Sequence, residues 1–246
     1  MIEEFLEGEE ASFILIANGE SFLPMATSQD HKRAFDADKG PNTGGMGAYS
    51  PAPVVTEHVY QRIISEVIKP TLKGMKDEGN YYTGFLYAGL MITADGTPKV
   101  IEYNCRFGDP ETQPVLLRLK SDLVSHCMAA LNNSLNREKV EWEPRKSLGV
   151  VMASGGYPGN YSNNHPILGL EDISSNYGHK VFHGGTKFAD NRLVTNGGRV
   201  LCVTALGDSL EDAKTSAYEL VSKISWENVQ YRTDIGWRAI EKNRKI

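Results

Sequence analysis

Two short turns constrain the fold of this chain more than any other feature of its sequence. Each turn is a dipeptide ending in glycine that lies between two runs of strand-forming residues. A two-residue turn of this kind joins neighbouring antiparallel strands. The sequence therefore predicts two hairpins: runs 11–17 and 20–25 around Asn18-Gly19, and runs 83–94 and 98–103 around Asp95-Gly96.

Apolar residues with helical spacing predict helices beside these strands. One stripe follows Thr56, an N-cap residue, and Pro70 is expected to kink or end that helix. A second stripe covers residues 208–224. Asp109 and Pro110 have the residue types of an N-cap and a first helical residue. Together with the hairpins, these patterns predict an α+β protein with mostly antiparallel sheets and packed helices.

The length and one polar stretch predict two domains. A chain of 246 residues can form one large domain or two modest ones. Residues 132–146 are polar and typical of a linker, so we expect the parts to be 1–133 and 146–246. The second part is expected to be a small C-terminal α+β domain, with strands at 148–153, 180–183 and 199–206.

Charge and composition exclude several classes of protein. Lys and Arg number 26 against 31 Asp and Glu, and the net charge of −5 argues against nucleic-acid binding. The three cysteines are far apart, which fits a reducing, cytoplasmic compartment better than a disulfide framework. The longest apolar run, 13–17, is too short to cross a membrane, and the acidic start is unlike a signal peptide.

Glu102 and Asn104 form the sharpest candidate site. Residues two apart on a strand share one face, so both side chains are expected to project together where the run 98–103 ends. Carboxylate and amide oxygens suit Mg²⁺. Arg106, just beyond them, can bind an anion through the paired N–H donors of its planar guanidinium. On the residues alone, an edge strand with solvated polar side chains remains the alternative.

A stretch rich in glycine and proline, from about Thr27 to Pro53, predicts a long loop. It contains the cations Lys32 and Arg33 but lacks the Gly-Lys-Ser/Thr ending of a P-loop. Glycine lets backbone N–H groups approach a ligand closely. Because fixing a glycine-rich backbone costs conformational entropy, we expect this loop to be mobile without a ligand and to become ordered on binding. A flexible surface loop without a ligand is the alternative. The acidic run 3–10, taken alone, is interpreted as a solvated charged segment.

Five longer stretches carry a resemblance to a known family: 3–12, 28–33, 40–53, 82–91 and 102–114. Taken together and in this order, they resemble the phosphoribosylamine–glycine ligases (glycinamide ribonucleotide synthetases) of the ATP-grasp superfamily. The runs 28–33 and 40–53 disfavour another ATP-grasp ligase, such as a carboxylase subunit. The resemblance implies an ATP-grasp fold and a place in purine biosynthesis.

The resemblance also implies the reaction and its nucleotide site. ATP phosphorylates the carboxylate of glycine, and the amine of 5-phosphoribosylamine then displaces phosphate to give glycinamide ribonucleotide. The adenine hinge is assigned to Glu3, Glu4, Phe5 and Leu6, with the Glu4 carbonyl and the Leu6 N–H at the adenine edge. Glu10 is assigned to the ribose hydroxyls.

The remaining roles carry over by position in the same way. The resemblance assigns Mg²⁺ or Mn²⁺ to Glu102 and Asn104, and a phosphate or acyl-phosphate contact to Arg106. Lys32 or Arg33 is expected to face a phosphate. Asp109 is expected to bind the ammonium group of glycine. The implied partners are small molecules, without nucleic acid or membrane.

The chain departs from the family pattern in two places. Residues 89–92 contain no carboxylate, where many ATP-grasp enzymes place another metal-binding acid. Family members also have an N-terminal α/β domain and a glycine-rich ATP lid before the hinge, so the resemblance covers only their C-terminal part. We therefore expect an incomplete ligase that is inactive alone and has the missing portion as a partner. The alternative is a non-catalytic fragment that binds nucleotide or metal.

Overall fold

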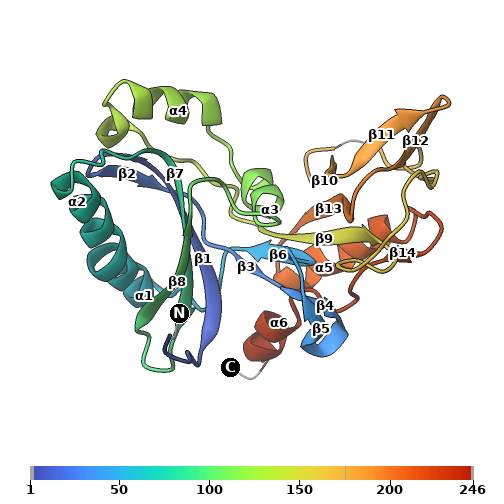
Figure 1. Cartoon of the computed structure of the whole chain (residues 1–246), viewed down its shortest axis with the longest axis horizontal. Helices are drawn as coiled ribbons and strands as arrows, with labels where there is room; N and C mark the ends of the chain where they lie inside the picture. The colour runs from blue at the N-terminus through green and yellow to red at the C-terminus, as the bar shows by residue number, and fades with distance from the viewer. Residues whose placement is uncertain (1–2, 175, 245–246) are drawn as a thin grey trace. The chain divides into compact units, whose positions relative to one another are not determined.

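The computed structural model describes residues 3–174 and 176–244, with the side chain of residue 243 left out, and the chain divides into two compact units (Figure 1). Unit 1 comprises Met1–Gln29, Pro51–Gly108 and Leu119–Glu143. Unit 2 comprises Asp30–Ser50, Asp109–Arg118 and Pro144–Ile246. Two segments of the predicted first part, 30–50 and 109–118, thus pack with unit 2. The division at 1–133 and 146–246 stays a prediction.

Unit 1 is built on a four-stranded antiparallel sheet in the order β2-β1-β7-β8. Both predicted hairpins are confirmed. One joins β1 (Glu9–Asn18) to β2 (Ser21–Pro24), and the other joins β7 (Thr83–Ile92) to β8 (Pro98–Asn104). The long central strands β1 and β7 pair with each other over their whole length, and β8 forms one edge of the sheet.

Helices cover one face of this sheet because alternate residues on its strands are apolar. Phe13 and Leu15 of β1 share a buried cluster with Val59, Ile63 and other helical residues. Figure 1 shows these helices lying along the sheet. They are α1 (Glu57–Arg62), the π-helical segment η2 (Ile63–Ile68) and α2 (Lys69–Asp77). Unit 1 also contains α4 (Leu123–Leu131) and the short η3 (Leu135–Arg137).

Pro70 was expected to kink or end the first helix, and the expectation that it ends the helix is wrong. Helical structure continues through Pro70 to Asp77. Pro70 has no N–H to donate, and the π-helical segment immediately before it places the proline in the first turn of α2, where that N–H is not needed.

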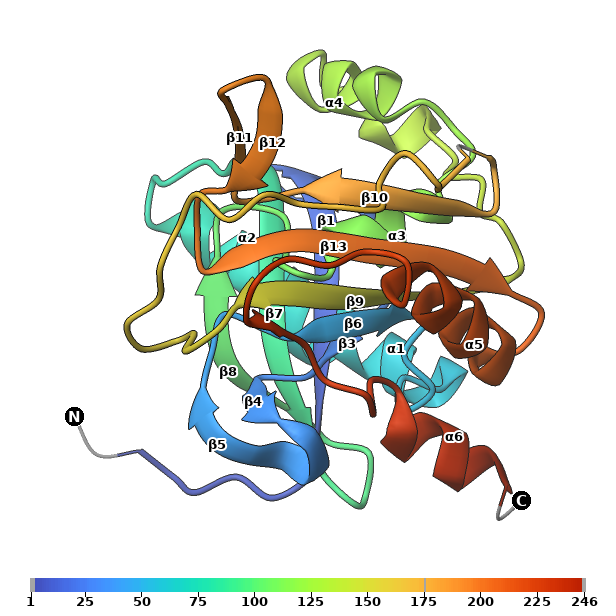
Figure 2. The same cartoon turned by 90° about the vertical axis from the view of Figure 1, so that its right-hand side faces the viewer.

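Unit 2 is built on a six-stranded sheet, in the order β10-β13-β9-β6-β3 with β14 pairing to β9 (Figure 2). The strands are β3 (Gln29–Asp30), β6 (Gly47–Ser50), β9 (Lys146–Ser154), β10 (His179–His183), β13 (Arg199–Gly207) and β14 (Val229–Gln230). The three strands predicted after the linker correspond to β9, β10 and β13. Helix α5 (Leu210–Val221) packs its apolar stripe on this sheet, and its N-terminus has a Ser209–Asp212 capping box.

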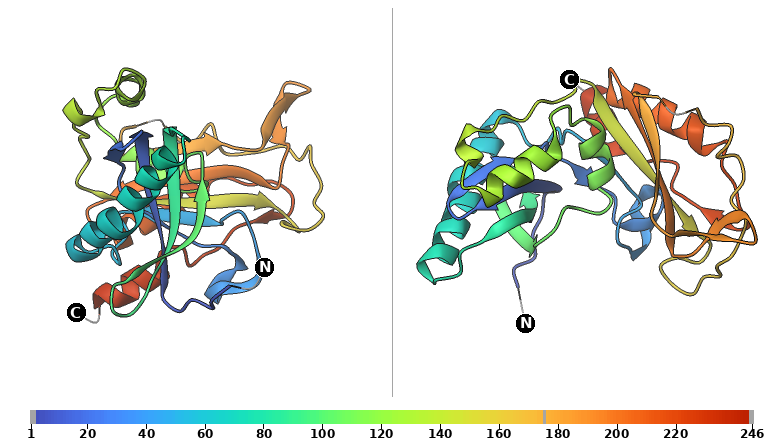
Figure 3. Two further views of the ribbon diagram at one scale, coloured as in Figure 1. Left: turned by 60° about the vertical axis from the view of Figure 1, so that its left-hand side comes forward. Right: turned by 90° about the horizontal axis from the view of Figure 1, so that it is seen from above.

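Smaller elements complete unit 2. Helix α3 (Thr112–Leu117) contacts the sheet, since Ser147 of β9 donates a hydrogen bond to the Pro114 carbonyl at 2.5 Å. A two-stranded hairpin projects from the unit (Figure 3). The other elements are β4 (Arg33–Phe35), η1 (Asp36–Asp38), β5 (Lys39–Asn42), hairpin strands β11 (Thr186–Ala189) and β12 (Arg192–Thr195), and α6 (Trp237–Arg244).

Two local expectations are wrong in this unit. Residues 27–53 are not one long loop: they contain four strands, and β6 lies buried between β9 and β3. Nonlocal pairing with β9 orders this glycine-rich stretch, which its own composition could not indicate. Asp109 and Pro110 also do not begin a helix, because α3 starts at Thr112 after Glu111. No helix in the described part of the chain is both long and apolar enough to span a bilayer.

A buried arginine ties the segment 33–38 to the segment 232–238 in unit 2. The side chain of Arg232 is fully buried. Its Nε and Nη2 donate to the two carboxylate oxygens of Asp234 at 2.7 and 2.8 Å, and its Nη1 donates to Asp38 at 3.0 Å. Nη1 also donates to the Arg33 carbonyl at 3.2 Å. Contact with His31 and hydrogen bonds from Arg232 hold the pKa of Asp38 well below its usual range.

We expect Arg232→Met to lower the free energy of unfolding of unit 2 by about 3–5 kcal/mol, because Asp38 and Asp234 would keep partly buried charges without their main partner. Urea unfolding followed by tryptophan fluorescence, to which Trp226 and Trp237 contribute from unit 2, measures the loss. Arg244→Met is the control, since that exposed arginine pairs with Glu211 on the surface and should cost about 1 kcal/mol or less. Similar losses in both variants would contradict the prediction.

His31 should make stability depend on pH. Its Nε2 accepts a hydrogen bond from the Gly236 N–H at 2.9 Å, and burial lowers the pKa of the ring. The ring has its ordinary pKa of about 6.5 in the unfolded chain and a lower pKa in the folded chain. Below about pH 6.5 the unfolded chain therefore binds more protons than the folded chain, and the stability of the fold decreases as the pH decreases. We expect His31→Gln to lose less stability between about pH 7.5 and 5.5 than the wild type. Equal pH dependence of the two would contradict this.

Candidate functional site

A pocket of about 490 Å³ lies in unit 1 beside the start of β1. Residues 3–7 have no regular secondary structure and precede the first pair of the β1–β7 ladder, Glu9 with Ile92. The structure brings all five predicted nucleotide-binding residues to this one pocket. Its lining is Glu3, Glu4, Phe5, Leu6 and Glu10 together with Met91, Lys99, Val100 and Ile101.

The pocket combines apolar walls with polar groups at its rim. Phe5 is 86% exposed, so its ring is available to pack against a ligand. Lys99 lies across from Glu4, with its Nζ 3.4 Å from the carboxylate. Such a pocket can hold a flat apolar ring while charged groups contact a polar ligand at the edge.

Gly8 fixes the path of the chain at this pocket. A Cβ built on Gly8 would lie 2.3 Å from the carbonyl oxygen of Ile92, closer than real Cβ atoms come to backbone. Only glycine therefore lets the segment 3–7 leave the sheet at this angle. The position of the pocket wall depends on this close approach.

The predicted metal ligands lie together at the end of β8. The Asn104 amide donates to Glu102 Oε1 at 3.3 Å, so both side chains share one face of the strand as expected. Gly89 pairs with Glu102 across the β7–β8 ladder, and its missing side chain leaves the space beside this carboxylate. Rotating the Asn104 amide would present two oxygens to a hard cation.

This donor set fits a magnesium ion that takes its remaining ligands from phosphate and water. Among the described residues, no cluster of three or more His, Cys, Asp or Glu side chains has the arrangement of an all-protein metal site. Residues 89–92 of β7, the strand that pairs with β8, contain no carboxylate that could add to this donor set.

Three predicted cationic residues have different surroundings. Arg106 follows β8 in unit 1 and is exposed, with its Nη1 donating to the Phe107 carbonyl at 2.9 Å. Lys32 and Arg33 belong to unit 2. The carbonyl of Lys32 accepts hydrogen bonds from the N–H and the hydroxyl of Thr43, and Arg33 donates to the Gly40 carbonyl at 2.8 Å.

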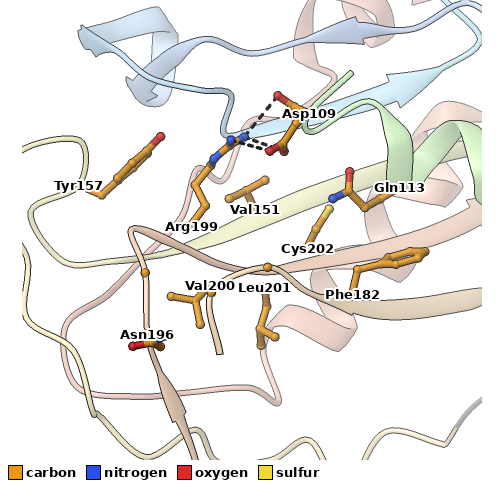
Figure 4. A pocket seen from close by; sticks show the side chains of 13 residues that line it. Asp109, Gln113, Val151, Tyr157, Phe182, Asn196, Arg199, Val200, Leu201 and Cys202 are labelled. Atoms are coloured by element: carbon orange, nitrogen blue, oxygen red, sulfur yellow. Dashed lines mark hydrogen bonds and ion pairs between the residues drawn. The ribbon is translucent and has the colours of Figure 1, made fainter. Parts of the chain in front are cut away.

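A second pocket, of about 460 Å³, lies entirely within unit 2 and contains Asp109 (Figure 4). Both carboxylate oxygens of Asp109 accept hydrogen bonds from Arg199, at 2.9 and 2.7 Å. The expected partner for the glycine ammonium is therefore already engaged with a cation. Gln113, Tyr157 and Asn196 add polar groups to the lining.

Sequence reasoning missed Arg199. It lies 90 residues from Asp109, and only the pairing of β13 in the sheet of unit 2 brings the two together. The glycines at 184, 185 and 197 were a local signal, because they line this pocket and let the backbones of Gly185 and Gly197 approach closely. Glycines of this kind do not identify the charged residue beside them.

Comparisons with known proteins agree with the fold. Residues 1–112 match the family described as phosphoribosylglycinamide synthetase, ATP-grasp (A) domain, and residues 147–238 match its C domain. The phosphoribosylamine–glycine ligase of Escherichia coli K12 is 62% identical over 247 residues, and that of Vibrio parahaemolyticus is 60% identical over 245. These alignments cover 99% and 100% of this chain but 57% of each relative, so the chain spans little more than half their length.

A solved structure has the same fold. The crystal structure of phosphoribosylamine–glycine ligase from Thermotoga maritima superposes with a TM-score of 0.84 and 37% identity. It covers 94% of this chain and 56% of its own. The predicted α+β ATP-grasp architecture is thereby confirmed.

Proposed function

We propose that this chain, which belongs to the phosphoribosylglycinamide synthetase family, carries the nucleotide-binding and metal-binding part of an ATP-dependent ligase that joins glycine to 5-phosphoribosylamine. The observation that carries the proposal is the convergence of Glu3, Glu4, Phe5, Leu6 and Glu10 on one pocket of unit 1. Strand β8, which carries the proposed metal ligands, contributes three further residues to the same lining, Lys99, Val100 and Ile101.

In this proposal the adenine ring lies in the pocket of unit 1. The Glu4 carbonyl accepts from the adenine amino group, and the Leu6 N–H donates to a ring nitrogen. The apolar side chains of Met91, Val100 and Ile101 cover the ring, and Glu10 accepts hydrogen bonds from the ribose hydroxyls. The exposed Phe5 gains a ligand surface to cover.

The phosphates then extend toward the end of β8. Glu102 and Asn104 would hold Mg²⁺, or Mn²⁺, whose chemistry is to neutralise charge on the transferring phosphoryl group. Arg106 binds phosphate oxygens of the nucleotide, because a fixed cation is most effective where negative charge develops. In unit 2, Lys32 or Arg33 binds a phosphate group of a substrate. A site closed to water protects the acyl phosphate of glycine from hydrolysis.

The reaction that we propose consumes three small molecules. Transfer of the terminal phosphoryl group of ATP to the glycine carboxylate gives ADP and an acyl phosphate. The amine of 5-phosphoribosylamine attacks the acyl carbon, and the C–O bond to phosphate breaks as the C–N bond forms. The free cysteines Cys105, Cys127 and Cys202 support a reducing compartment, and we place the reaction in the cytoplasm.

Gly8→Ala should weaken nucleotide binding about tenfold or more, because the added Cβ pushes the segment 3–7 away from Ile92 and opens the pocket. Titration of the chain with a fluorescent ATP analogue measures the dissociation constant. Gly74→Ala is the matched control, since a Cβ at Gly74 in α2 meets no atom within 4 Å. Unchanged affinity in Gly8→Ala would place the nucleotide elsewhere.

Glu102→Gln should lower glycine-dependent ADP formation roughly 100-fold, since the loss of an anionic ligand removes charge stabilisation of the transferring group. The assay uses the chain alone and the chain joined to the part of the Escherichia coli relative that the alignment leaves uncovered. Glu78→Gln is the control, because Glu78 is an exposed glutamate at the end of α2. Wild-type turnover of Glu102→Gln at limiting Mg²⁺ would refute the metal assignment. No turnover in either form of the wild type would leave only a nucleotide-binding role.

A further inference from the structure

Arg199 is held by two kinds of acceptor that differ in how easily they can leave. Its Nη1 donates to the Gly44 carbonyl at 2.7 Å, a backbone group that stays in place. Its Nη1 and Nη2 also donate to the two oxygens of the Asp109 carboxylate. Figure 4 shows the two side chains pointing toward each other at the pocket. This two-point contact is the one that a guanidinium makes with a carboxylate or phosphate of a ligand.

The two partners also differ in exposure. The side chain of Arg199 is 24% exposed, whereas that of Asp109 is 54% exposed. A Cβ on Gly44 would lie 2.8 Å from Nη2 of Arg199, so the backbone at Gly44, between β5 and β6, packs closely against the guanidinium. Asp109 can therefore turn into solvent while Arg199 keeps its orientation. Because exposed ion pairs contribute little to stability, exchanging the Asp109 carboxylate for another anion costs little.

We propose that Asp109 is an internal competitor for Arg199, and that the pocket of unit 2 binds a small molecule whose carboxylate or phosphate replaces the Asp109 carboxylate on the guanidinium. The inference rests on the proposed function only for the choice of ligand, since glycine supplies a carboxylate and 5-phosphoribosylamine a phosphate. Arg199 is then a substrate-binding residue that the sequence did not reveal.

The rest of the pocket suits such a ligand. Its volume of about 460 Å³ lies in the range that small-molecule sites occupy. Gln113 and Asn196 bring amide groups, and the Gln113 Oε1 is buried without a hydrogen-bond partner in the described structure. An N–H or O–H group of a ligand would satisfy this oxygen. Val151 and Leu201 add apolar surface.

The proposal predicts opposite effects for the two members of the pair. Isothermal titration of the 246-residue chain uses three probes: inorganic phosphate, glycine and ribose 5-phosphate. Asp109→Asn removes the competing charge and should bind a probe about tenfold tighter than the wild type, while Arg199→Ala should lose binding. Tighter binding of glycine identifies the carboxylate as the ligand group, and tighter binding of ribose 5-phosphate identifies the phosphate.

Other results would overturn the proposal. If the pair is only a structural contact, both variants bind equally or lose binding together, and Asp109→Asn shows no gain. If Arg199→Ala does not fold, Arg199→Lys keeps a cation without the planar fork and should still bind more weakly than the wild type. Arg192→Ala is the control, because Arg192 is an exposed arginine of β12 outside the pocket, and it should bind as the wild type does. ATP titration of the same samples tests the proposed function separately, at the pocket of unit 1.

Discussion

The pairing of β1 with β7 is the constraint on which unit 1 depends. It runs from Glu9 opposite Ile92 to Asn18 opposite Thr83, without a break in register. One end of this ladder sets where the chain enters the sheet, and hence the segment 3–7. Strand β8 pairs with β7 through a second ladder, whose register shifts between Gly89 and Leu90, and this ladder sets where Glu102 and Asn104 project. The pocket thus depends on the first ladder and the two polar side chains on the second, and a one-residue slip in either would reverse the faces of the residues that it places.

Unit 2 depends on a different interaction, because segments that are distant in its sequence are joined through a buried charged residue, Arg232. Fully buried arginine is tolerated in proteins only when its donors are satisfied. Arg232 meets that condition with Asp234, two residues along the chain, and with Asp38 and the Arg33 carbonyl, which are remote in sequence. Removing one acceptor would leave a buried charge without a partner. The hydrogen bonds of Arg232 therefore favour this arrangement of the segments over other compact arrangements.

The sequence predicted well what local chemistry determines. Dipeptides such as Asn18-Gly19 encode a turn by themselves, and the two-residue period placed Glu102 and Asn104 on one face. It failed where partners are distant. Strand β6 was predicted as loop because it lies in a stretch rich in glycine, and its pairing with β9, about 100 residues away, leaves no local signal in the sequence. Arg199 was missed for the same reason. The roles assigned to Glu10 and Lys32 came from family resemblance, whereas the pattern alone already indicated that Arg106 could contact an anion.

Strand β8 is an edge strand of the sheet in unit 1, and this position gives the charge of Glu102 a second role. An edge strand offers main-chain N–H and C=O groups to any other strand, and β8 also exposes Val100, Ile101 and Tyr103. Charged residues on such an edge discourage pairing between molecules, because pairing would remove their side chains from water. Lys99 and Glu102 flank the exposed apolar pair on this strand. In the proposed function, the Glu102 carboxylate therefore has two roles on this strand: it would bind a metal ion, and its charge discourages edge-to-edge association of the protein.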